Sequence, residues 1–156
     1  MNNDHCSARE AEELAASLDA FGAILRQPTQ VTCIDDSLGA RAVRSNLHRL
    51  ARAARNAGFV TYSSGVLRLV ERLEPDLRTS GLNERQFVLL RHWAQLSLCY
   101  FAASANFGRA ADLVNLLNFG SAPAFGIDER IELLAGLLRE AVRSDPLQKA
   151  ASVVSH

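Results

Sequence analysis

Four arginines and one histidine share one face of a helix predicted between residues 38 and 57. They are spaced three, four, four and three residues apart: Arg41, Arg44, His48, Arg52 and Arg55. At about 100° per residue, all five side chains fall within about 80° of one another around the helix axis. Guanidinium groups on both sides of an imidazole attract anions and stabilise charge that develops on a phosphoryl oxygen. The pattern therefore predicts an anion site in which His48 acts as a nucleophile towards phosphorus.

The apolar residues of the same helix lie on a different side of it. They form one stripe: Val43, Leu47, Leu50, Ala54 and Ala57. By the same periodicity, this stripe centres roughly 130° away from His48, so the histidine is predicted to face solvent. An arginine-rich outer face is also typical of a bundle helix that is simply solvated, with no role for His48. That alternative stays open.

The other residues with chemical potential are better explained as structure. His92 lies on an apolar helix and is expected to be a packed structural histidine, and Cys99 is expected to be a small core residue. Tyr62, Trp93 and Tyr100 are interpreted as core. The sequence contains no glycine-rich phosphate loop and no set of residues with metal-ligand spacing, so we expect no cofactor and no metal. No hydrolase or kinase site can be assembled from these residues.

Helical periodicity runs through nearly the whole chain. A capping-box pattern at Ser7 opens the first helix, Pro28 stops it, and Gly58 is placed to end the second helix in a left-handed conformation. The segment 29–34 is interpreted as a connector, because a short isolated strand would have nothing to pair with. Six helices are predicted, over about residues 7–27, 38–57, 62–75, 83–105, 109–118 and 128–143.

These helices predict an all-α bundle in one domain that spans residues 1–156. Residues 7–105 would form a four-helix core, residues 106–145 two further helices, and residues 146–156 a flexible tail. The fourth helix is apolar on two sides, so it is either central in the bundle or covered by a second copy in a homodimer. Packing of the last two helices over the fourth helix is the opposing possibility.

Composition limits the kind of partner and the compartment. Seventeen basic and seventeen acidic residues cancel, and this balance argues against a general nucleic-acid binder. No apolar run approaches the length of a membrane span, and the first ten residues are too polar for a signal peptide. Three widely spaced cysteines suit reduced thiols. We therefore expect a cytoplasmic protein that binds neither nucleic acid nor membrane.

The stretch HRLARAARNAGF, residues 48–59, resembles the signature of the histidine-phosphotransfer (HPt) domain family. The positions in register are His48, Leu50, Ala53, Ala54, Gly58 and Phe59. The preceding DDSLGARAVRSNL is similar to the family's lead-in to the histidine helix, and VLRLVERLE is similar to the helix that pairs with it. The resemblance covers residues 36–74 and, through the four-helix plan, extends to about residue 105.

This resemblance implies a phosphorelay protein. His48 would accept a phosphoryl group from the aspartate of a response-regulator receiver domain, or from a histidine kinase, and pass it on. The family's four-helix domains hold no nucleotide, and the receiver supplies the metal. In this sequence Arg44 and Arg52 would hold the phosphoryl oxygens, and Arg41 and Arg55 would steer an acidic receiver surface.

Two positions depart from the family pattern. The usual Lys three residues after the histidine is Ala51 here, and the Gly that follows it is Arg52. Arg52 either obstructs a docking receiver or replaces the missing positive charge. If it obstructs, the chain is a non-catalytic helical interaction module that binds a signalling partner without phosphate transfer. The sequence leaves both hypotheses open.

Overall fold

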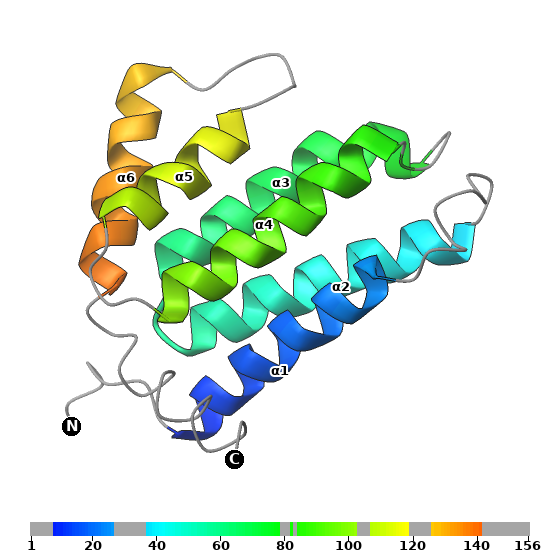
Figure 1. Ribbon diagram of the computed structural model, residues 1–156, viewed down its shortest axis with the longest axis horizontal. Helices are drawn as coiled ribbons and strands as arrows, with labels where there is room; N and C mark the ends of the chain where they lie inside the picture. Colours follow the sequence, from blue (N-terminus) through cyan, green and yellow to red (C-terminus); the bar gives the residue numbers. More distant parts are fainter. Residues whose placement is uncertain are drawn as a thin grey trace.

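The computed structural model describes residues 8–26, 37–78, 82, 84–102, 107–118 and 126–141. These residues contain six α-helices and no strand, so the predicted all-α bundle is confirmed (Figure 1). The helices are α1 (Ala8–Leu25), α2 (Ser37–Asn56), α3 (Val60–Arg78), α4 (Glu84–Ala102), α5 (Phe107–Asn118) and α6 (Ile127–Ala141). The predicted cap at Ser7, the connector at 29–34 and the tail at 146–156 lie outside the described residues.

The third helix is longer than predicted, because it continues through Pro75 to Arg78. A proline removes one backbone hydrogen bond, which usually ends a helix. Here tertiary contacts stabilise the last turn. Leu77 is buried, and the Asp76 carboxylate accepts a hydrogen bond of 2.5 Å from Gln86 Nε2 on α4.

The six helices surround a continuous core. Helix α1 packs on α2 and α4, and α2 packs on α3. The last two helices lie across one end of this unit, with α5 against α4 and α6 against both α3 and α5 (Figure 1). The predicted packing of the last two helices over the fourth helix thus describes α5, whereas α6 packs on α3 and α5.

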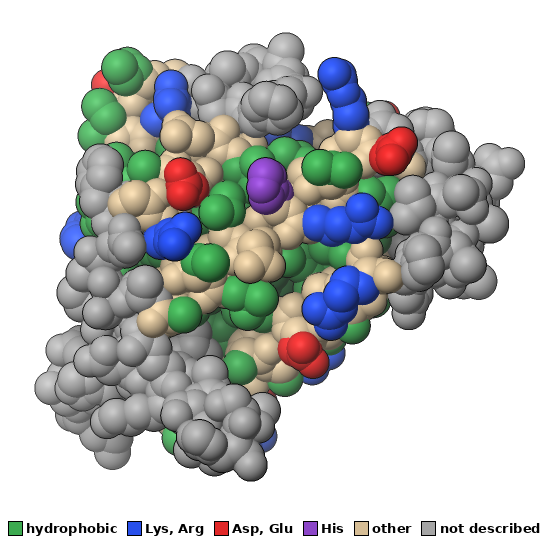
Figure 2. Space-filling model, in the orientation of Figure 1, with side chains coloured by type: hydrophobic (Ala, Val, Ile, Leu, Met, Phe, Trp, Pro, Cys, Tyr) green, Lys and Arg blue, Asp and Glu red, His purple; other side chains and the backbone are tan. Residues whose placement is uncertain are grey.

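Helix α4 keeps one face uncovered by the described helices. Its buried residues pack inward, but Val88 and Leu98 are each about half exposed. Helices α1 and α5 both pack on α4, yet these two apolar side chains stay accessible. Figure 2 shows apolar side chains on this side of the molecule, interspersed with charged ones. The homodimer stays a prediction.

Helices α2 and α3 form an antiparallel hairpin around Gly58, whose φ of 94° is left-handed as predicted. The amide of Phe59 donates to Ala54 O at 2.8 Å, and the amide of Gly58 donates to Arg55 O at 3.1 Å. These two bonds are the Schellman pattern that ends a helix at glycine. Beyond the turn the helices approach closely, since Ser63 Oγ donates to Ala51 O at 2.7 Å.

An aromatic cluster joins α3 to α4. Tyr62 stacks on Trp93 with ring centroids 5.7 Å apart and meets Phe101 edge-on at 4.8 Å. Its hydroxyl donates to Ser97 Oγ at 2.6 Å, so the one polar atom of the ring is satisfied in the core. Tyr62, Trp93 and Tyr100 are buried, which confirms that they are core residues.

The first turn of α3 is capped by a residue from α6. The residue that precedes α3 is Phe59, which has no side-chain acceptor for the free amides of the helix. The Glu140 carboxylate takes that role and accepts the amide of Thr61 at 2.8 Å and that of Tyr62 at 3.3 Å. Gly136 permits the close approach, since a Cβ there would lie 2.3 Å from Thr61 Oγ1. The carboxylate also complements the positive end of the α3 dipole.

We expect Glu140→Ala to lower the free energy of unfolding by about 1–2 kcal/mol, the usual cost of losing a helix cap. Glu132→Ala is the matched control, because Glu132 is an exposed glutamate on the same helix. Its effect should stay within about 0.5 kcal/mol. Urea titrations of both variants measure the difference, and equal effects would contradict the capping role.

The chain has two tyrosines, and burial raises the pKa of Tyr62 and of Tyr100 above the ordinary value of about 10. The Glu140 carboxylate raises the pKa of Tyr100 further. The folded state favours the neutral phenols. The stability that the two buried phenols contribute is therefore complete below about pH 10 and is lost as the pH rises above it.

In a spectrophotometric titration, we therefore expect little phenolate absorbance from the native protein at pH 10. In denaturant, half of the absorbance should appear near that pH, because the unfolded chain exposes both phenols. Phenolate at pH 10 in a protein with native circular dichroism would show that one ring is accessible to water.

Candidate functional site

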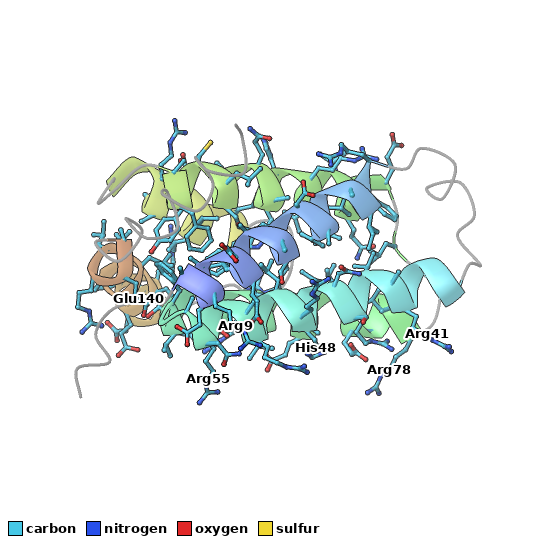
Figure 3. All side chains as sticks on the ribbon, turned by 90° about the horizontal axis from the view of Figure 1, so that it is seen from below. Arg9, Arg41, His48, Arg55, Arg78 and Glu140 are labelled. Carbon is cyan, nitrogen blue, oxygen red and sulfur yellow. The ribbon has the colours of Figure 1, made fainter. Side chains whose placement is uncertain are left out.

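The packing of α2 turns the predicted arginine and histidine stripe outward. All five residues of the apolar stripe are buried. On the opposite side Arg41, His48, Arg52 and Arg55 are exposed, whereas Arg44 is half-buried. Figure 3 shows Arg41, His48 and Arg55 along one edge of α2, pointing away from the bundle. The structure thus places the five predicted residues on one accessible surface.

A shallow surface depression of about 470 Å³ surrounds His48. Its lining residues all come from α2: Arg41, Arg44, Ser45, His48, Arg49 and Arg52. Sequence reasoning missed Arg49, because it lies about 100° from His48 on the helical wheel. Its long side chain nevertheless reaches the depression. Arg55 lies on the same exposed surface but does not line the depression.

Arg44 is paired with a carboxylate from α3. Its Nε donates to Glu74 Oε2 at 3.2 Å, and its Nη2 lies 3.1 Å from Glu74 Oε1. Arg78, one turn further along α3, donates from Nε to the same Oε1 at 3.0 Å. The hydrogen bond from Arg78 lowers the pKa of the Glu74 carboxyl. Desolvation raises this pKa in part, and the charge of Arg44 lowers it further. One carboxylate therefore serves two guanidinium groups.

The sequence analysis also missed Glu74 and Arg78, although the spacing of the hairpin indicates that Glu74 lies near Arg44. Residues at similar distances before and after the turn lie opposite each other in an antiparallel hairpin. Arg44 is 14 residues before Gly58, and Glu74 is 16 residues after it. The spacing alone gives no side-chain direction, so the ion pair becomes visible only in the tertiary structure.

The rest of the stripe is electrostatically uncompensated among the described residues. Helix α2 contains five arginines and no acidic residue. Within the part of the chain that the structure describes, Arg41, His48, Arg52 and Arg55 make no side-chain hydrogen bond or ion pair. A region of positive charge with an accessible imidazole can bind an anion and present a nucleophile to it.

His92 is exposed, so the expectation of a packed structural histidine is wrong. The residue lies on the side of α4 that the described helices leave uncovered. The neighbouring Arg91 is engaged elsewhere, because its Nε donates to Leu25 O at 3.0 Å. His92 thus lacks the array of arginines that surrounds His48. Cys99 is half-buried.

The two positions that depart from the HPt pattern have opposite environments. Ala51 is 3% exposed and faces α3, where its carbonyl accepts the hydroxyl of Ser63. Arg52 is exposed and lines the depression beside His48. A lysine is thus hard to accommodate at position 51, whereas the charge at position 52 lies where an anionic ligand would meet it.

Among the described residues, no group of histidine, cysteine, aspartate and glutamate side chains could hold a metal ion. In the same part of the chain, no helix has both the length and the apolar character needed to cross a membrane. No protein-family model matches the chain, and neither a curated protein nor a solved structure matches it.

We expect Ala51→Lys to lower the free energy of unfolding by about 2–3 kcal/mol, because the long side chain must displace α3 or bury its stem and charge. Ser45→Lys is the control, since Ser45 is exposed on the same helix. In thermal and urea unfolding, the free energy of unfolding of the control should stay close to that of the unmodified protein. Equal stability of Ala51→Lys would mean that α2 and α3 can separate at this point.

Proposed function

We propose that this chain is a cytoplasmic phosphorelay protein in which His48 accepts and donates a phosphoryl group. The observation that carries the proposal is the exposed imidazole midway along α2, with Arg44 and Arg52 one turn away on either side. The resemblance of residues 48–59 to the HPt signature supports the same chemistry. The partner would be a receiver domain or a histidine kinase, whose acidic surface suits the arginines of α2.

The transfer step requires no cofactor on this chain. The lone pair of the unprotonated imidazole nitrogen attacks the phosphorus of an aspartyl phosphate. A P–N bond forms, the P–O bond to the aspartate breaks, and the carboxylate leaves with the bonding electrons. The second ring nitrogen then releases its proton to water. The reverse sequence returns the phosphoryl group to an aspartate.

The arginines have different roles in this step. Arg52 lines the depression beside His48, and in this proposal it contacts the equatorial phosphoryl oxygens through charge-assisted hydrogen bonds. Arg44 lines the same depression but is shared with Glu74. Arg41 and Arg55, near the two ends of the stripe, are suited to steering an acidic partner surface.

Phosphoramidate, a small phosphoryl donor for imidazole nitrogen, tests the reactivity of His48 without a partner. We expect His48 to be phosphorylated at least about tenfold faster than His92, because fixed guanidinium charge stabilises the transition state. His92 is a matched internal control, since it is exposed but lacks the arginine array. Acid-labile phosphate located by mass spectrometry, with His48→Gln and His92→Gln variants, measures the difference.

A panel of receiver domains charged with acetyl phosphate tests the relay itself. Phosphate should move to the unmodified protein and to His92→Gln but not to His48→Gln, and all three should keep the same helical circular dichroism. If His48 reacts no faster than His92 and no receiver transfers phosphate, the proposal is wrong.

A non-catalytic interaction module is the second candidate function. The specific observation in its favour is the pair of departures beside the histidine, with Ala51 buried and Arg52 exposed where the family has Lys and Gly. In that case the same receiver panel would bind to the α2 surface without phosphate transfer. Arg52→Ala would then weaken binding, whereas His48→Gln would leave binding unchanged.

A further inference from the structure

The ion pair between Arg44 and Glu74 occupies part of the proposed anion site. Both carboxylate oxygens of Glu74 contact the guanidinium group of Arg44, at 3.2 and 3.1 Å. The side chains remain accessible, with exposed fractions of 33% for Arg44 and 27% for Glu74. A pair that water still reaches contributes little net free energy, so a stronger ligand can replace one partner.

A phosphate group beside His48 would compete for the same guanidinium. Arg44 lines the depression together with His48, one helical turn away. Phosphate oxygens and carboxylate oxygens present the same bidentate geometry to arginine. Two anions that share one guanidinium also repel each other, so each reduces the affinity of the other.

We propose that Glu74 is a built-in competitor of the anion site on α2. Its carboxylate binds Arg44 while the site is empty and releases it when a phosphate group occupies the depression. Arg78 on the same helix then remains as the partner of Glu74. Occupancy of the site is thereby coupled to the ion pair that joins α2 to α3, and Glu74 sets how tightly phosphate binds.

The inference rests on the proposed function only in placing an anion beside His48. It concerns binding, so it can be tested without any phosphoryl transfer. If transfer fails but the binding result below is obtained, the competitor role stands and the relay does not. If transfer succeeds and the binding result is absent, only the competitor role falls.

The probe is inorganic phosphate, titrated at constant ionic strength and followed by the NMR signals of the His48 ring and the Arg44 Nε–H group. We expect Glu74→Gln to bind phosphate about three- to fivefold more tightly than the unmodified protein, the upper part of the range for release of a solvent-accessible ion pair. The ring signal of His92 should not follow the same saturation curve.

Glu71→Gln is the matched control, because it removes the same charge from the same helix. Glu71 lies in the groove between α3 and α6 instead of on the side of α3 that meets Arg44. Its effect on phosphate affinity should be less than about 1.5-fold, the part due to net charge. The gain in phosphate affinity of Glu74→Gln beyond that of Glu71→Gln then reports the contact between Glu74 and Arg44.

A double-mutant cycle with Arg44→Gln isolates that contact further. In the Arg44→Gln background, the change Glu74→Gln should alter phosphate affinity no more than Glu71→Gln does. The proposal is overturned if Glu74→Gln and Glu71→Gln act alike, if the gain persists without Arg44, or if Glu74→Gln shows no saturable binding. Native circular dichroism of each variant shows that it is folded when titrated.

Discussion

The close antiparallel pairing of α2 with α3 is the constraint on which the rest of the molecule depends. The left-handed Gly58 reverses the chain within one Schellman turn, and Ala51 lets Ser63 approach the α2 backbone. Once the apolar stripe of α2 is buried against its neighbours, rotation of that helix about its axis is no longer free. The arginine and histidine face must then point outward, and Glu74 comes to lie opposite Arg44.

Helix α1 packs on α2, whereas α4 and α6 contact this hairpin through α3. Tyr62 carries the aromatic contacts to α4, while Glu140 binds the first turn of α3 from α6. Both connections lie near the start of α3, next to the turn at Gly58. The C-terminal helices therefore stabilise the end of the hairpin and leave the outer surface of α2 accessible.

Charge segregation gives α2 its chemical character. The chain as a whole has no net charge, yet α2 carries five arginines and no acidic residue. The acidic residues lie elsewhere in the chain, and among the described residues only Glu74 pairs with an α2 arginine. A neutral protein can in this way present a positive surface to an acidic partner while its long-range field stays small.

The sequence alone determined the helices, the buried stripe of α2, the turn at Gly58 and the outward position of His48. Each follows from periodicity or from the conformational freedom of glycine, which are local properties. The tertiary structure decided which faces are covered. It exposed His92 and Leu98 on α4, extended α3 beyond Pro75 and paired Arg44 with Glu74. These outcomes depend on contacts between residues far apart in the chain, and no helical period encodes which neighbour a side chain meets.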